Sequence, residues 1–380
     1  MSKTKNTSFF HILLGIALAL VVTIVGNYGA QLVGQLLVSS NILPEGSASP
    51  ISGIFVAILI GMILRNTIGI HNRFERGIQF TLKYGLRLGI ILLGLRLSFA
   101  EAFKFGAWGL PIIVFSIGCG LIVTLYFTNK MKESLRLGAL IAAGTSICGV
   151  TAIMAIAPVI EAKDDEISYA VGNITIFGLI GMLVYPYLAP LLFDGDAVQA
   201  GFFLGTAVHD TAQVTGSALI YSELHDAEEV INVATVTKLT RNLFLILVIP
   251  LLAFFFFKRD HGKTGDAPTL PKWYKFIPGF VILFLLMSVV RTIGDVTLES
   301  SGLAFKILEK ESWESFYNSA TGLSSNYLLA MAMASVGLST DLSKLKSLGM
   351  RPFYIGLIAA ISVGIVSFIL VTILGPYIKA

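Results

Sequence analysis

Near the middle of the chain, an apolar stretch is interrupted by two ionisable side chains and several groups that form hydrogen bonds. On a helix, one face would carry the residues spaced by three or four positions, which are Thr206, His209, Asp210 and Gln213, with Gly205 beside them. Ionisable groups inside apolar segments usually face a pathway or a partner. We therefore predict that this face contacts a substrate and that His209 and Asp210 handle a coupling proton or cation. In the alternative interpretation, a re-entrant segment exposes this polar face to water.

A second polar set follows in the next apolar run. Lys238, Arg241 and Asn242 lie at helical spacing, and the two cations are deep in the run. They would snorkel to an interface, pair with Asp210, or supply positive charge to a ligand. Because positive charge exceeds negative charge inside the spans, we predict that they bind a small anion, such as a carboxylate or an oxyanion of the sulfate type.

Small and hydroxyl-bearing residues break up a third apolar run. They are Gly144, Thr145, Ser146, Cys148 and Gly149. A helix interrupted here would free backbone groups, which a membrane tolerates only where they line a cavity or bind something. We predict that these residues contact the substrate, and close helix packing is the alternative.

Two other functions remain open at this level. A sodium-coupled carrier would bind the cation through Asp210, Thr206, Asn242 and freed carbonyl groups. A membrane-embedded enzyme would use His209 and Asp210 as acid and base, but no HExxH or GxSxG motif supports it. We expect a protein that is not an enzyme.

The composition places all these residues in a membrane. Of 380 residues, 55% are hydrophobic and only 13% are charged, against about a quarter in soluble domains. Spans need about 20 apolar residues. Eleven runs qualify, at 9–38, 51–65, 78–97, 108–128, 137–160, 168–192, 200–222, 230–257, 276–292, 321–339 and 352–378. This pattern predicts an all-α membrane protein with about 10–11 transmembrane helices in a single polytopic domain, residues 1–380.

The remaining expectations concern partners and placement. The net charge of +4 comes from basic residues at the ends of apolar runs, so we expect no nucleic acid partner. No nucleotide, metal or redox motif occurs, so we expect no cofactor. If the N-terminus is cytoplasmic, most Lys and Arg residues fall in cytoplasmic segments, as Lys130, Lys132 and Arg136 do. We therefore expect a cytoplasmic N-terminus. A homodimer stays open.

Internal similarity suggests related halves. The stretch GTSICGVTAI from Gly144 resembles GTAVHDTAQV from Gly205. Inverted repeats with broken helices are common in secondary carriers, which bind substrate near the membrane midplane. We expect repeat halves at about 45–192 and 200–378, with chance similarity as the alternative.

Three stretches carry a family resemblance: 144–160, 205–218 and 238–245. They resemble the YeiH-like family of bacterial inner-membrane proteins, labelled sulfate exporters, and the similarity runs across nearly the whole chain. The family typically has His-Glu where this chain has His209-Asp210, so the acid is one methylene shorter. The resemblance implies a multi-span secondary carrier with inverted repeats and broken helices, driven by an ion gradient. It does not separate sulfate from sulfite, a sulfonate or a small carboxylate.

Overall fold

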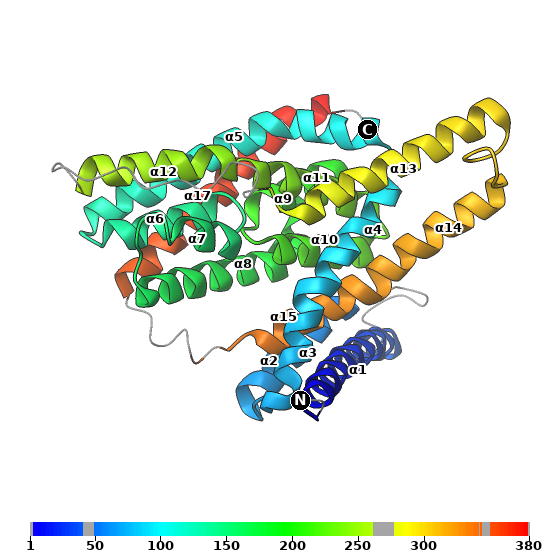
Figure 1. The fold of residues 1–380 in the computed structure, drawn as a ribbon, viewed down its shortest axis with the longest axis horizontal. Helices are drawn as coiled ribbons and strands as arrows, with labels where there is room; N and C mark the ends of the chain where they lie inside the picture. The colour runs from blue at the N-terminus through cyan, green and yellow to red at the C-terminus, as the bar shows by residue number, and fades with distance from the viewer. Residues whose placement is uncertain (1–2, 41–48, 261–276, 342, 344–349, 379–380) are drawn as a thin grey trace. The chain divides into compact units, whose positions relative to one another are not determined.

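Helices account for most of what the structure contains (Figure 1). The computed structural model describes residues 3–40, 49–260, 277–341, 343 and 350–378. Its helices are α1 (Lys3–Ser39), α2 (Gly53–Thr67), α3 (Asn72–Phe80), α4 (Leu86–Leu93), α5 (Phe99–Lys130), α6 (Leu135–Ser146), α7 (Val150–Ile156), α8 (Asp164–Leu192), α9 (Ala197–Ala207), α10 (Thr211–His225), α11 (Glu229–Leu243), α12 (Leu245–Asp260), α13 (Gly279–Ser301), α14 (Lys310–Leu323), α15 (Ala330–Ser339) and α17 (Met350–Leu374). The all-helical prediction is confirmed. Parts of both predicted repeat halves, including 261–276, lie outside the described residues.

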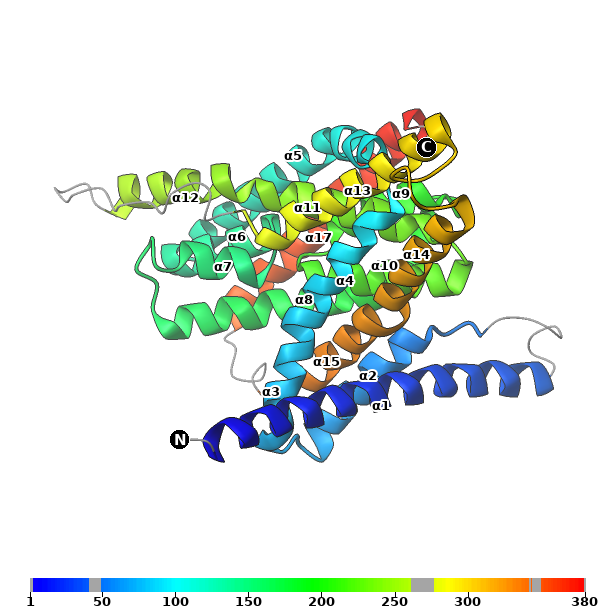
Figure 2. The same cartoon turned by 45° about the vertical axis from the view of Figure 1, so that its right-hand side comes forward.

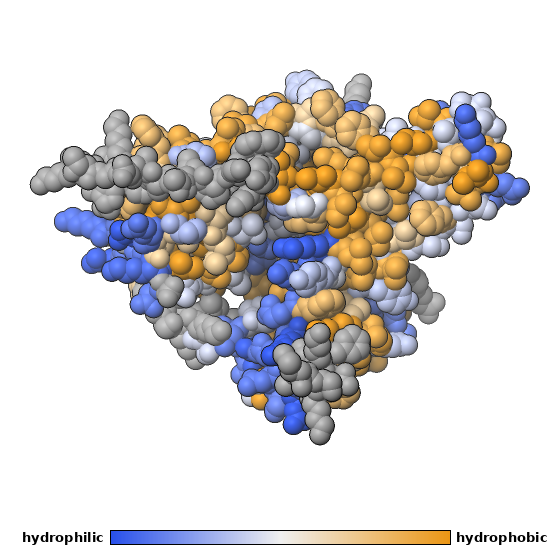
Figure 3. All heavy atoms as spheres, viewed as in Figure 1, coloured by the Kyte–Doolittle hydropathy of each residue, from blue (hydrophilic) through white to orange (hydrophobic). Residues whose placement is uncertain are grey.

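Fewer helices cross a membrane uninterrupted than the eleven apolar runs suggest. Among the described residues, six helical stretches are long and apolar enough, or seven if α11 and α12, bent by 42°, form one span. The runs predicted at 137–160 and 200–222 are each divided between two shorter helices. Apolar side chains point outward along the long helices, as on α13, where Ile282 and Leu286 are about half exposed (Figure 3). Such a surface suits lipid.

The described residues form two compact units. Unit 1 comprises 1–103, 218–228 and 280–342. Within it, α1 lies along α2 and α3 (Figure 2). Glycines allow these close approaches: a Cβ added at Gly77 would overlap the backbone of Gly15, and one added at Gly337 would overlap the carbonyl of Ile58. Small residues of this kind let helix backbones approach closely in membranes.

Two helical stretches of unit 1 contain π-helical turns. Residues Thr81–Gly85 connect α3 to α4, and Ser324–Leu329 connect α14 to α15. The stretches pack together where the Ser324 hydroxyl donates a 2.7 Å hydrogen bond to the carbonyl of Gly89. A π-turn displaces backbone groups from their regular partners, and here a side chain of the neighbouring stretch bonds to one of the nearby carbonyls.

Unit 2 comprises 104–217, 229–279 and 343–380, and it contains every candidate site residue. Its core joins α6 and α7 to α8, α12 and α17, and it is made almost entirely of Ile, Leu, Val and Ala. Helix α9 packs against α11. The breaks in the pairs α6–α7 and α9–α10 include the buried residues Ile147, Cys148, Val208 and His209, whereas Asp210 and Thr211 are partly exposed.

The glycine contact in unit 1 generates a stability prediction. Gly337→Ala places a Cβ within 3.1 Å of the Ile58 backbone, which cannot move aside without shifting α2. Overpacking of this kind costs about 1–3 kcal/mol, so we expect a lower midpoint of thermal unfolding in detergent.

Gly322→Ala is the matched control, because a Cβ there meets nothing within 4 Å. This variant should unfold at or slightly above the wild-type temperature, since alanine favours a helix. Equal unfolding midpoints for the two variants would contradict the packing assignment.

Candidate functional site

The site is built on two helix breaks in unit 2. The first separates Ser146, the last residue of α6, from Val150, the first of α7; the second separates α9 from α10 between Ala207 and Thr211. Gly149 takes φ +67°, a backbone conformation that favours glycine. The last carbonyl groups of a helix have no partner within it. Inside a membrane they need another donor.

Helix α11 supplies that donor through two cations one turn apart. The Lys238 ammonium donates to the carbonyl of Ile147 at 2.8 Å, to that of Val208 at 3.1 Å, and to that of His209. Arg241 donates from Nε to the Ser146 carbonyl, from Nη2 to the Thr145 carbonyl, both at 2.7 Å, and from Nη1 to the Thr206 carbonyl. Each cation therefore binds both breaks at once, and together they satisfy six carbonyl groups.

Two glycines bring α11 close enough to make these bonds. A Cβ at Gly205 would lie 2.8 Å from the Thr237 side chain, and one at Gly201 would lie 2.6 Å from Val233. Glycines four residues apart place two backbones in contact. Gly205 packs α9 on α11 and in doing so positions Lys238 and Arg241, and its contact with a substrate stays a prediction.

Asp210 lies on the other side of the breaks, where α7 and α10 begin. Its Oδ1 accepts from the N–H of Ala212 at 2.9 Å, and the N–H groups of Val150 and Gln213 also donate to the carboxylate. A Cβ at Gly149 would lie 2.8 Å from its Oδ2. The carboxylate therefore caps both half-helices, the position that helix dipoles favour for a negative charge.

The ionisable side chains of this site differ in how far they are exposed to solvent. Lys238 and Arg241 are fully buried and His209 is 2% exposed, whereas Asp210 is partly exposed. The Lys238 ammonium also acts on the Asp210 carboxylate by direct charge interaction. Asp210 is the charged member of this group that a solute at the surface of unit 2 contacts most easily.

Several predicted substrate contacts are engaged in helix packing. Gln213 donates to the Thr175 carbonyl of α8 at 3.1 Å, and the Ser146 hydroxyl lies against Gly120 of α5. The Thr206 hydroxyl bonds to the carbonyl of Phe202 within its own helix. Cys148 is only 2% exposed. The spacing grouped these residues correctly around the breaks but gave no direction to each side chain.

Other predicted residues keep buried polar atoms without a partner among the described residues. These atoms are Oγ1 of Thr145, Nδ1 of His209 and Oδ1 of Asn242, and the same holds for Oγ of Ser146 and Oε1 of Gln213. The Asn242 amide donates to the Thr211 hydroxyl at 3.3 Å. Gly144 packs against Ile174 and Ile153, at 2.7 and 3.0 Å from an added Cβ. Because buried polar groups are normally hydrogen-bonded, these five atoms leave capacity for a ligand or water.

Sequence reasoning missed the backbone partners of the cations. The carbonyls of Ile147 and Val208 belong to apolar residues that attract no attention in a search for chemical groups. The signal that identifies them is the combination of a glycine-rich interruption in one span with Lys and Arg three residues apart in another. Thr211, which contacts Asn242 at the start of α10, was also missed.

The bonds of Lys238 generate a second prediction. Lys238→Met keeps a long side chain but leaves three buried carbonyls without their donor, and an unsatisfied buried acceptor costs about 1–3 kcal/mol. We expect the free energy of unfolding to fall by about 3 kcal/mol or more, measured from tryptophan fluorescence during denaturation in detergent.

Lys310→Met is the control, since Lys310 is exposed and contacts Glu314 only at 3.9 Å. That substitution should change stability by no more than about 0.5 kcal/mol. If both variants were equally stable, the hydrogen bonds of Lys238 would not be stabilising the two helix breaks.

Comparison with known proteins agrees with this architecture of apolar helices. Residues 14–356 match the family model described as "Conserved hypothetical protein 698". The chain is 32% identical over 329 residues to a UPF0324 membrane protein of Streptococcus agalactiae, covering 87% of this chain and 91% of that protein. It is 33% identical to a UPF0324 membrane protein of Fusobacterium nucleatum (86% and 91% covered) and 32% identical to one of Bacillus anthracis (95% and 94% covered). The resemblance predicted from the sequence is thus confirmed, and the chain belongs to the UPF0324, or YeiH-like, family of multi-pass membrane proteins.

Proposed function

We propose that the protein is a secondary transporter of a small anion, of the sulfate, sulfite, sulfonate or carboxylate class, driven by an ion gradient. The observation that carries the proposal is the meeting of two broken helices in unit 2, tied together by Lys238 and Arg241 and capped by Asp210. Broken helices at membrane depth are tolerated where they are buried in protein or line a cavity, and carriers use them as binding sites.

The charge balance favours an anion. Lys238 and Arg241 carry two positive charges, and among the described residues of unit 2 the acidic side chain of Asp210 interacts with Lys238. One positive charge remains, in a region where the effective dielectric constant is low and charge interactions are strong. An anion bound at the partly exposed side, near Asp210 and Thr211, would neutralise it.

We propose that transport is coupled to protons through Asp210. Its carboxylate accepts hydrogen bonds from the N–H groups at the start of α7 and α10. Protonation would weaken these hydrogen bonds and would remove a negative charge beside the incoming anion. Anion and proton would therefore bind together. The electrostatic field in which this proton binds is set by the buried groups near Asp210, which are Lys238, Arg241 and His209.

Sodium coupling is less well supported. The carbonyl oxygens freed by the breaks, which would be the ligands of Na⁺, already accept hydrogen bonds from Lys238 and Arg241. The Thr206 hydroxyl is bonded within its own helix. An enzyme is also disfavoured, because Cys148 and Ser146 are buried away from any substrate.

The proposal predicts opposite effects of one substitution on binding and on transport. Asp210→Asn removes the charge that repels an anion, and an interaction of about 1.4 kcal/mol or more makes binding at least about tenfold tighter. Uptake into vesicles driven by a pH gradient should be lost, because the variant takes up no proton. Binding would be measured by thermal shift with sulfate, sulfite, taurine and dicarboxylates.

Asp210→Glu is the matched control and should retain the affinity of the wild type and part of its transport. If no anion stabilises the protein while sodium stabilises the wild type and not Asp210→Asn, the sodium-coupled alternative replaces this one. If neither acts, the assignment to transport of this anion class is wrong.

We also propose that the protein lies in the bacterial inner membrane with its N-terminus in the cytoplasm. The connection between α5 and α6 carries Lys130 and Lys132, and Arg136 follows it, as expected for a cytoplasmic segment. Glu133→Cys should be labelled by an impermeant maleimide only after inside-out vesicles are prepared, in a background with Ser at both native cysteines. Labelling in intact spheroplasts would show that the protein has the opposite orientation.

A further inference from the structure

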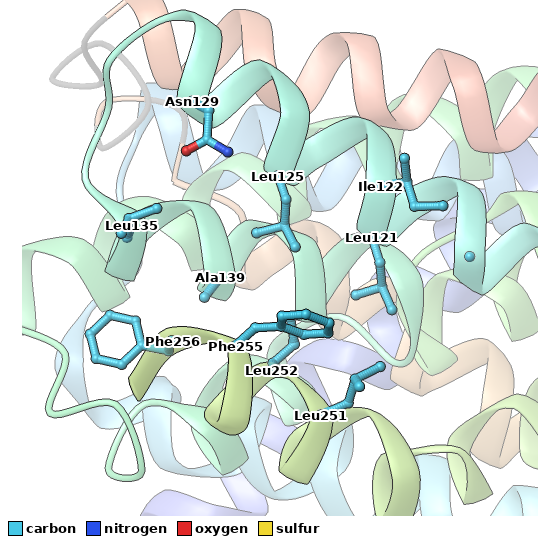
Figure 4. Close-up of a pocket in the computed structure, with 11 residues that line it drawn as sticks. Leu121, Ile122, Leu125, Asn129, Leu135, Ala139, Leu251, Leu252, Phe255 and Phe256 are labelled. Carbon is cyan, nitrogen blue, oxygen red and sulfur yellow. The ribbon is translucent and has the colours of Figure 1, made fainter. Parts of the chain in front are cut away.

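An apolar groove of about 490 Å³ runs along the surface of unit 2 between α5, α6 and α12 (Figure 4). Leu121 and Leu125 of α5 lie opposite Leu252 and Phe255 of α12, and Ala139 of α6 lies between them. Phe255 is 53% exposed. The groove is separate from the helix breaks, and none of its lining residues belongs to the candidate site.

A glycine keeps this groove open. A Cβ added at Gly118 would meet nothing within 4 Å, whereas one added two residues later, at Gly120, would meet the Ser146 hydroxyl. Gly120 thus serves helix packing, and Gly118 does not. Gly118 also borders a second apolar groove of about 480 Å³ between α5 and α17. Both grooves share Gly118 and Ile122, so they flank one stretch of α5.

One end of the groove is polar and basic. Asn129 lies there, at the end of α5 (Figure 4). Lys130 and Lys132 are exposed nearby, and the Arg136 guanidinium lies 5.7 Å from the ring centre of Phe256, which lines the groove. Among residues 129–136 these three cations face one acid, Glu133. Glu166, from α8, accepts a hydrogen bond from Ser134 in the same connection.

We propose that this groove binds an acyl chain of an anionic phospholipid whose headgroup contacts Lys130, Lys132 and Arg136. Apolar walls with cations at one end match the two halves of such a lipid, and basic pockets beside membrane helices bind anionic headgroups. Inorganic phosphate shares the headgroup chemistry but cannot occupy apolar walls. A second copy of the chain would fill the groove but would not require an anion. This inference does not depend on the proposed transport activity.

The test uses the full-length protein in detergent, with lipid binding followed by thermal shift and native mass spectrometry. The probes are phosphatidylglycerol and phosphatidylcholine with identical acyl chains, and inorganic phosphate. Phosphatidylglycerol should raise the unfolding temperature more than phosphatidylcholine does, by mass action, and phosphate should have no effect. Gly118→Leu fills the groove and should weaken phosphatidylglycerol binding at least about tenfold.

Gly322→Leu, at a helical glycine of unit 1 that also has open space beside it, is the control and should bind lipid as the wild type does. The double variant Lys130→Gln, Lys132→Asn should reduce the effect of phosphatidylglycerol to that of phosphatidylcholine. Equal stabilisation by the two lipids in the wild type, or undiminished binding by Gly118→Leu, would overturn the proposal. A smaller oligomer for Gly118→Leu by light scattering, without any lipid effect, would assign the groove to a second copy instead.

Discussion

The need of buried carbonyl groups for a hydrogen-bond donor is the constraint on which unit 2 depends. A helix that stops inside a membrane leaves its last carbonyls without partners, and lipid offers none. Here two helices stop in the same core, and α11 supplies two cations that bind three carbonyls each. The glycines of α9 and the burial of α11 follow from this requirement, since the cations must approach the breaks closely.

The same arrangement explains why so much charge is tolerated. A lone buried ammonium or guanidinium would be costly, but the carboxyl ends of α6 and α9 carry partial negative charge that these cations offset. Asp210 provides the complementary solution at the amino ends of α7 and α10. The result is a fixed positive side, fully buried, and a negative side that is partly exposed and free to respond to a proton or a ligand.

Much of this could be predicted from the sequence, because helices and breaks leave local signals. The apolar runs located the helices, and the Gly, Ser and Thr residues from Gly144 to Gly149 located the first break. The spacing of Lys238 and Arg241 placed them on one face. The sequence could not show which neighbouring groups each of these side chains contacts. It placed Gln213 on the polar face but did not show that its amide nitrogen bonds to α8, because spacing identifies a face but not the neighbour that the face meets. It also could not show that Lys238 and Arg241 bond to carbonyl groups, since these partners belong to the backbone and have no sequence signature.

The central claim, that Lys238 holds the breaks closed, can be tested most directly at Cys148, a native thiol that follows Ile147 and is 2% exposed. In a Cys119→Ser background, maleimide labelling of Cys148 should be slow in the otherwise wild-type protein and in Lys310→Met. In Lys238→Met it should be at least about tenfold faster, because local opening becomes easier by about 1.4 kcal/mol or more. Equally slow labelling in all three proteins would show that the breaks stay closed without the cation and would contradict the account.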